Sequence, residues 1–479
     1  MASFGTWITR GSILSVGPIV EYGSRFLRTA LLSRLLGQHE FGISVAIATM
    51  LAVAALITDL SLDKFVVTST GSDRPHALAA VHALSIARGL VLSGILFITA
   101  SATARIFGVP DSAGSFAVAA FCPLIASFAH LNIKQIQQDF QFTSEMIAQV
   151  VTQLLALAAA TIGAFVFRDH RAMLASFLTE AVVYTIASHI LAHTQYGLLS
   201  NRAILQKAAI FGLPLIVNGV GLAALSQFDR MLVGGWLGVQ ILGHYAVMLA
   251  LSVYPAALIF RVFGPIGISS LLQHRHTARF GKDYALLMFF SGVISVTYSL
   301  LIALSLDWLV PTVFGPSFHV NQYEHVLIVA IVYFRLMRGT APTMYYLVTQ
   351  KTGELALLNL TSGVGIVIAF WILHYRSSLD SVLLGLLVGD FLALAVVIYM
   401  SSVRSVGPRN LWHTDFIMSL ISLTIILGAL VWMPDPTWET RSVISLLGLF
   451  GIAAEFAVGF YTQRGFGLSA QRTVRQAPN

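Results

Sequence analysis

Three charged residues, Glu21, Arg25 and Arg28, interrupt the first long apolar run of the chain, which extends from about residue 11 to residue 36. They share one face of a helix, because residues three and four apart are neighbours on a helix surface. A charge at the centre of a bilayer costs roughly 2.5–3.5 kcal/mol on insertion scales, so it normally faces a protein interior or a watery cavity. We therefore predict that this face lines a pathway for a polar substrate.

Two arrangements of these residues remain open. In the functional one, Glu21 neutralises Arg25, and Arg28 is the better candidate to contact an anion. In the structural one, Glu21 and Arg25 form an internal pair, and Arg28 donates to backbone carbonyls.

Further charged residues lie within later apolar runs. They are Arg88, Glu180, Arg261, Arg335, Arg338, Asp390 and Glu455, with Asp59 near the end of its run. Arg335 and Arg338 are three residues apart and share a helical face. Arg261 lies between two prolines, which would kink its helix and free carbonyl groups, as suits a cavity-lining element.

Arginine suits phosphate because its planar guanidinium forms paired hydrogen bonds and stays charged. A site for a lipid-linked phosphate or diphosphate needs such residues, whereas a site for a cationic drug needs acids and aromatic rings. The predicted substrate-binding residues are Arg25, Arg28, Arg261, Arg335 and Arg338.

Other charged residues are predicted to be charge partners or coupling residues. They are Glu21, Asp59, Arg88, Glu180 and Asp390. We expect Arg88 to pair with Glu180. Asp390 and Glu455 fit structural and functional roles equally well.

The common catalytic motifs are missing from the sequence. It contains no P-loop, no His-Glu-x-x-His segment and no Cys-x-x-Cys pair, and the single Cys122 excludes an internal disulfide. The 14 histidines are scattered. We therefore expect no catalytic residue, no metal and no cofactor.

The composition indicates a polytopic membrane protein. Of 479 residues, 57% are hydrophobic and 10% charged, against about 25% charged in ordinary soluble domains. The mean hydropathy is +0.81. We count about fourteen segments of spanning length, which leaves no room for a soluble catalytic domain.

The charge distribution predicts the orientation. The net charge of +7 fits basic cytoplasmic loops better than nucleic-acid binding, because cytoplasmic loops carry excess lysine and arginine. With the N-terminus inside, the basic residues favour the inside loops about two to one. Both termini are then cytoplasmic, as an even number of helices requires.

An internal repeat joins the two halves of the chain. Gly37 and Gly42 recur as Gly238 and Gly243, 201 residues later, with similar apolar flanks. The first glycine of each pair is expected to end a helix in the left-handed conformation, and the second to permit a tight re-entry. The offset spans six helices, so both halves enter the membrane in the same orientation and form a parallel repeat.

This repeat predicts the domain organisation. Residues 1–200 form an N-lobe of six helices, and residues 201–402 form a C-lobe of six. Residues 403–479 contain helices thirteen and fourteen and a basic cytoplasmic tail. The fold class is an all-α membrane protein with two six-helix lobes around a central cavity.

Several segments resemble the polysaccharide flippases of the MOP exporter superfamily (Wzx-type). The segments are 211–219, 225–234, 237–247, 34–42, 58–60 and 137–142. There are two departures: Ser61 replaces an expected glycine, and Ile43-Ser44 replaces a usual aromatic residue. The first half is therefore the weaker match.

The resemblance implies alternating access that moves an undecaprenyl-diphosphate-linked oligosaccharide from the inner to the outer leaflet of the bacterial inner membrane. It also implies that helices one, two, seven and eight line the cavity, so Arg25, Arg28 and Arg261 become its best candidates. The expected partners are the lipid-linked oligosaccharide, membrane lipids and a polysaccharide polymerase or export machinery, without nucleic acid.

Two alternatives remain open. One is a multidrug cation antiporter of the same superfamily, which predicts an acidic, aromatic cavity. The other is a polytopic sugar polymerase, an enzyme that would need a larger outside loop than any in this sequence.

Overall fold

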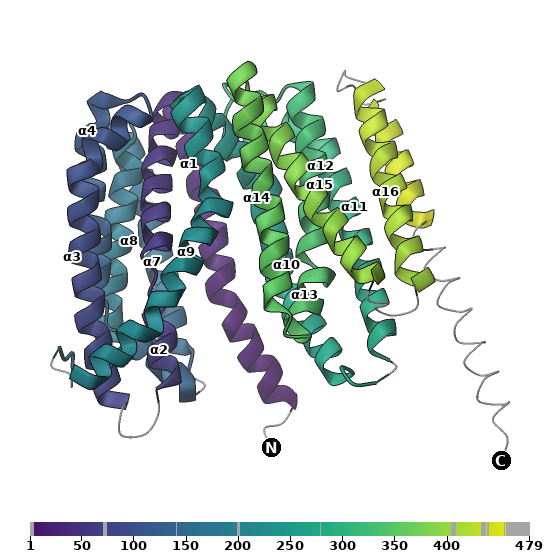
Figure 1. Cartoon of the computed structure of the whole chain (residues 1–479). Helices are drawn as coiled ribbons and strands as arrows, with labels where there is room; N and C mark the ends of the chain where they lie inside the picture. Colours follow the sequence, from purple (N-terminus) through teal and green to yellow (C-terminus); the bar gives the residue numbers. More distant parts are fainter. Residues whose placement is uncertain are drawn as a thin grey trace, which may run out of the picture. The chain divides into compact units, whose positions relative to one another are not determined.

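The part of the chain that the computed structural model describes consists of helices and their connections (Figure 1). The described residues are 4–69, 74–139, 141–198, 202–277, 279–403, 409–432, 437, 440–454 and 456. The predicted all-α fold class is confirmed.

Eight of the described helices are long and apolar enough to cross a bilayer, or nine if Pro110–Ser127 and Asn132–Asp139 form one broken span. Shorter apolar helices occur at Val239–Leu251, Phe416–Trp432 and Thr440–Ala454. A helix suits hydrocarbon because it satisfies its own backbone hydrogen bonds. The chain is a multi-pass membrane protein, and about fourteen spans are consistent with these helices.

The chain separates into two compact units. The first contains Met1–Ala250 and Thr312–Phe318, and the second contains Leu251–Pro311 and His319–Asn479. The lobes predicted from the repeat, with a boundary near residue 200, stay a prediction.

The first unit is built around its longest helices. It contains α1 (Phe4–Ile57), α2 (Leu62–Thr68), α3 (Arg74–Ile106), η2 (Pro110–Ser112), α4 (Ala113–Ala119), α5 (Phe121–Ser127), α6 (Asn132–Gln135), η3 (Ile136–Asp139), α7 (Thr143–Phe167), α8 (Arg171–Ile190), α9 (Arg202–Leu237) and the first part of α10 (Val239–Gln273). Helix α1 packs against α7, α8 and α9, and α7 packs along α8. This arrangement brings the charged face of α1 against two helices that are distant in sequence.

A short segment near the end of α11 (Phe280–Phe314) packs on α1 within the first unit. Arg34 donates a hydrogen bond to the carbonyl oxygen of Thr312. The rings of Phe41 and Phe318 meet edge to face, with 6.3 Å between their centroids. These contacts explain why Thr312–Phe318 belongs to the first compact unit together with α1.

The first glycine of each repeat pair has a positive φ. Gly37 has a φ of 76° and interrupts α1, and Gly238 has a φ of 88° between α9 and α10. An L-residue with a side chain rarely adopts such an angle, whereas glycine does so at little cost. Both glycines thus have the positive φ that the prediction requires, but the ψ of 176° at Gly37 lies outside the left-handed helical region.

The second glycine of each pair has a role beyond local re-entry. A Cβ on Gly42 would lie 1.8 Å from the carbonyl oxygen of Val239, and one on Gly243 would lie 2.7 Å from that of Gln38. The corresponding turns of the two repeats therefore pack directly on each other. Both positions need glycine because backbone meets backbone there.

The second unit contains the rest of α10 and most of α11. It also contains α12 (Gln322–Gly339), α13 (Ala341–Val348), α14 (Thr352–Tyr375), α15 (Leu379–Val403) and α16 (Arg409–Trp432). Helix α12 packs on α15, and α14 packs closely along α15. The close approach depends on small residues, because a Cβ on Gly385 would lie 2.4 Å from Ala369 Cα.

Replacing Gly42 with Ala should destabilise the protein by about 3 kcal/mol, because overpacking against a backbone oxygen cannot be relieved by a side-chain rotation. Thermal unfolding of the detergent-solubilised protein measures the effect. Gly94→Ala is the matched control, since its Cβ would meet nothing within 4 Å and alanine favours a helix. Equal unfolding temperatures for Gly42→Ala and the wild type would contradict the packing of the two turns.

Candidate functional site

Arg28 is the centre of a buried hydrogen-bond network between α1, α7 and α8. It is 3% exposed. Its Nη1 donates to Ser176 Oγ and Glu180 Oε2, each at 2.9 Å, and its Nη2 donates to Gln153 Oε1 at 2.9 Å. Ser24 on α1 also donates to the backbone oxygen of Gln153 at 3.0 Å. These bonds fix α1 against α7 and α8.

This network changes the interpretation of Arg28. The structural arrangement expected backbone carbonyls as its partners, but its partners are side chains. The functional arrangement made it the better candidate to contact an anion, but its guanidinium faces protein side chains and it does not line the pocket described below. A direct contact between Arg28 and substrate stays a prediction, and it would require this network to open.

Arg25 lies one turn away and is much more accessible. Its side chain is 52% exposed, and its Nη2 lies 3.0 Å from Glu21 Oε1 and 4.0 Å from Glu180 Oε1. The predicted Glu21–Arg25 pair is confirmed. Of the two arginines on this face, Arg25 is the one that a ligand can reach.

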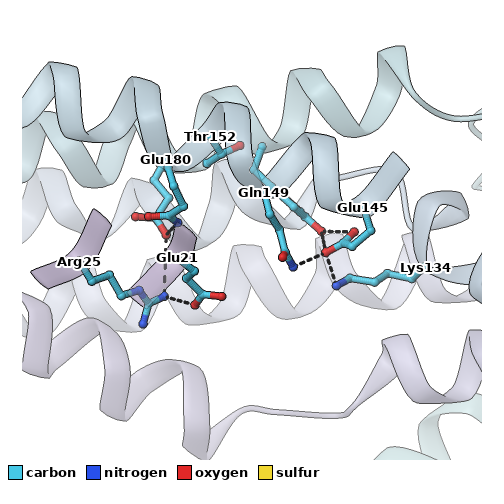
Figure 2. Close-up of a pocket in the computed structure, with 9 residues that line it drawn as sticks. Glu21, Arg25, Lys134, Glu145, Gln149, Thr152 and Glu180 are labelled. Carbon is cyan, nitrogen blue, oxygen red and sulfur yellow. Dashed lines mark hydrogen bonds and ion pairs between the residues drawn. The ribbon is translucent and has the colours of Figure 1, made fainter. Parts of the chain in front are cut away.

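A polar pocket of about 180 Å³ opens beside these residues (Figure 2). Its lining comes from α1, α6, α7 and α8 and consists of Glu21, Arg25, Lys134, Glu145, Gln149, Thr152, Gln153, Glu180 and Tyr184. Such a lining is unusual inside apolar helices, because each polar group loses hydration there. The pocket is the candidate functional site of the first unit.

Glu145 organises the opposite wall of the pocket. It is 6% exposed and accepts a hydrogen bond from Lys134 Nζ. It also accepts from Gln149 Nε2 at 2.8 Å and from the Tyr184 hydroxyl at 3.1 Å. Figure 2 shows this group and the Arg25 group as separate networks on the pocket wall. The carboxylate is thus compensated by one cation and two neutral donors.

The sequence carries a signal for these residues in the spacing of its polar positions. Gln149, Thr152 and Gln153 follow Glu145 by four, seven and eight residues along α7. All four therefore share one face of an otherwise apolar helix. The charged residues alone do not reveal this face, because two of its members are amides and one is a hydroxyl. The pairing of this face with α1 and α8 is a tertiary contact that spacing does not reveal.

The predicted Arg88–Glu180 pair is wrong. Arg88 Nε donates to Thr58 Oγ1 and its Nη2 to the Ala55 oxygen, each at 3.3 Å. Glu180 instead faces Arg28, because α8 packs on α1 at that level. Arg88 therefore holds α3 to the end of α1.

Asp59 stabilises a strained turn. Ser61 has a φ of 44°, at the position where the family resemblance suggested glycine. Its backbone nitrogen donates to Asp59 Oδ1 at 2.7 Å, and its hydroxyl lies 3.3 Å from Asp59 Oδ2. The carboxylate thus supports a conformation that a non-glycine residue rarely adopts. A coupling role for Asp59 stays a prediction.

The second unit contains a separate charged cluster on α12, α14 and α15. Arg335 Nε lies 2.7 Å and Arg338 Nη2 lies 3.4 Å from the carboxylate of Asp390, whose side chain is 2% exposed. Ser362 donates to the same carboxylate at 2.9 Å, and Arg338 Nη1 donates to Asn359 Oδ1 at 3.3 Å. The two arginines share a face, as their spacing indicated, and one carboxylate bridges them.

Arg261 belongs to α10, but its side chain lies outside the described part of the structure, as does Glu455. Within the described ranges, no group of three or more histidine, cysteine or acidic residues could hold a metal ion.

Comparisons with known proteins agree with the fold. A family profile described as "Polysaccharide biosynthesis protein" matches residues 31–322. None of the curated protein sequences matches the chain. The structure of the lipid II flippase MurJ in an inward closed conformation is 11% identical, with a TM-score of 0.71, and the match covers 94% of this chain and 98% of that one.

Two further structures belong to the MOP superfamily. An inward-facing multidrug resistance MATE transporter is 14% identical with a TM-score of 0.57, over 80% of this chain and 93% of that one. A transporter from Pyrococcus furiosus is 14% identical with a TM-score of 0.51, and the match covers 83% of this chain and 95% of that one. The predicted resemblance is confirmed, and the fold is that of transporters rather than of an enzyme.

Arg28→Ala should destabilise the protein by about 3 kcal/mol, because removing one partner of a buried ion pair leaves the other uncompensated. Arg25→Ala should change stability by less than about 1 kcal/mol, because it removes an accessible pair. Thermal unfolding of the two purified variants measures the difference. A loss for Arg25→Ala as large as that for Arg28→Ala would show that burial does not separate their roles.

Proposed function

We propose that this chain, which belongs to the polysaccharide biosynthesis protein family, is a flippase for a polyprenyl-diphosphate-linked oligosaccharide. It moves this substrate across the bacterial cytoplasmic membrane by alternating access during surface polysaccharide assembly. The observation that carries the proposal is the half-exposed Arg25 on the wall of a charged pocket, within a helix that is apolar enough to span the membrane. A charged side chain within a membrane-spanning helix is costly, so an accessible one beside a pocket favours a role in binding a polar ligand.

The charge of the accessible residues supports an anionic lipid as the substrate. Arg25 presents a guanidinium of which only one edge faces Glu21. In the second unit, Arg335 and Arg338 keep side-chain exposures of 24% and 20% beside their shared carboxylate. Guanidinium groups match diphosphate oxygens in geometry and charge, while the polyprenyl tail remains in lipid.

The proposal includes the predicted topology and partners. The two lobes, 1–200 and 201–402, move against each other, and both termini lie in the cytoplasm because the inside loops carry the basic excess. The partners are the lipid-linked oligosaccharide, the surrounding lipids, and a polymerase or export machinery that receives the product.

The fold match to a multidrug MATE transporter favours a second candidate, a cation antiporter. Such a transporter needs a carboxylate that is available to a cation. In the pocket, Glu21 and Glu180 lie within 4.0 Å of arginine nitrogens, and Glu145 is bonded to Lys134. This pairing supports the flippase. Binding of a cationic dye that sodium or protons displace would favour the antiporter.

Arg25→Ala should reduce surface polysaccharide at least about tenfold, because one lost charge-assisted bond to diphosphate is worth about 1.5–3 kcal/mol. The lipid-linked oligosaccharide should then accumulate in the inner leaflet, where extraction and labelling measure it. Arg105→Ala is the matched control, since this exposed arginine bonds to the Ser101 oxygen of its own helix. Normal polysaccharide in cells that carry only Arg25→Ala would sink the proposal.

A further inference from the structure

We propose that the pocket of the first unit binds the sugar that adjoins the diphosphate, and not the diphosphate itself. This inference rests on the proposed function and names the part of the substrate that the pocket takes. It is carried by the charge balance of the lining, by one unpartnered buried hydroxyl, and by the size of the cavity.

The pocket and the arginine behind it carry balanced charge. The acids are Glu21, Glu145 and Glu180, and the bases are Arg25, Arg28 and Lys134. Each carboxylate already lies beside a nitrogen cation. A diphosphate inside the pocket would have to compete with these carboxylates for the same cations, and it would bring several negative charges close to three others. An uncharged ligand avoids both difficulties.

Thr152 supplies the second observation. The residue is 2% exposed and lines the pocket, and its Oγ1 has no hydrogen-bond partner among the described residues. Buried hydroxyl groups are nearly always bonded, so one without a partner on a residue that lines the pocket marks a place where a ligand atom would complete the hydrogen bonding. A hydroxyl can donate and accept, and so can each hydroxyl of a sugar.

The amide of Gln149 is a second neutral group on the pocket wall that can bond a ligand. Gln149 uses its amide nitrogen on Glu145, and its amide oxygen receives no hydrogen bond from a described residue. Gln149 and Thr152 lie three residues apart on α7, so they face the pocket together. Figure 2 shows both side chains on its wall. An adjacent amide oxygen and hydroxyl suit two neighbouring hydroxyls of a sugar ring.

The size of the cavity limits the ligand to a single ring. Its volume of about 180 Å³ corresponds to the space of about six water molecules. That space suits one hexose ring and is too small to enclose a whole oligosaccharide. Arg25, half-exposed on the same wall, can then bind the diphosphate that is attached to this ring outside the pocket.

The test compares two probes on the purified full-length protein. One is a short-chain polyprenyl diphosphate that carries one hexose, and the other is the same lipid without the sugar. Thr152→Val keeps the shape of the side chain and removes the hydroxyl. It should weaken binding of the sugar-bearing lipid about threefold to tenfold, the effect of one lost hydrogen bond, and leave the sugar-free lipid unchanged.

Two further variants exclude a general structural effect. Ser93→Ala removes another buried, unpartnered hydroxyl of the same unit that does not line the pocket, and it should change neither affinity. Gly17→Ala would place a Cβ 2.7 Å from Gln149 Oε1 and so displace that amide. This variant should weaken binding of the sugar-bearing lipid and leave binding of the sugar-free lipid unchanged, as Thr152→Val does.

Equal affinities of Thr152→Val and the wild type for the sugar-bearing lipid would overturn the inference, and so would equal losses for both lipids. In either case the proposed flippase would stand, provided that the wild type binds the sugar-free lipid. A wild-type protein that binds neither lipid would overturn the proposed function itself.

Discussion

A charge within the hydrocarbon of a bilayer must be compensated inside the protein, and the arrangement of the first unit depends on how α1 meets this requirement. Arg28 is almost completely buried and donates to Ser176, Glu180 and Gln153 on two other helices. Because the partners come from α7 and α8, the same bonds that compensate the charge also fix the position of α1. The burial of Arg28 and the packing of α1 on α7 and α8 therefore depend on the same hydrogen bonds.

The pocket is a consequence of this compensation. Ion pairs and amides that satisfy one another leave a polar surface which is electrically balanced and still able to bond a ligand. On the opposite wall, Glu145 and Lys134 form another ion pair that compensates a buried charge. A transporter needs such a surface, because it must bind a polar head group at a depth where water is scarce, and release it again. Because the charges of the pocket already balance one another, the polar head group is not held by a net charge and can be released as well as bound.

The sequence predicts local features well and distant pairs poorly. The Glu21–Arg25 pair follows from helical spacing, and the positive φ of Gly37 follows from its place after an apolar run. The Arg28–Glu180 pair joins residues 152 positions apart, and no local rule identifies it, so the sequence predicts Arg88 as the partner of Glu180 instead. The polar face of α7 follows from the spacing of its residues, but the pocket that it forms with α1 and α8 depends on tertiary contacts that spacing does not reveal.

The Arg28–Glu180 bond is expected to hold α1 against α8 in the first unit, and a double-mutant cycle measures its contribution. The unfolding free energies of Arg28→Met, Glu180→Gln and the double variant are measured against the wild type. The structure predicts a coupling energy of about 2 kcal/mol, as expected for contacting charges in one network. Losses that add within about 0.5 kcal/mol would show that the two residues act independently, and would contradict the claim.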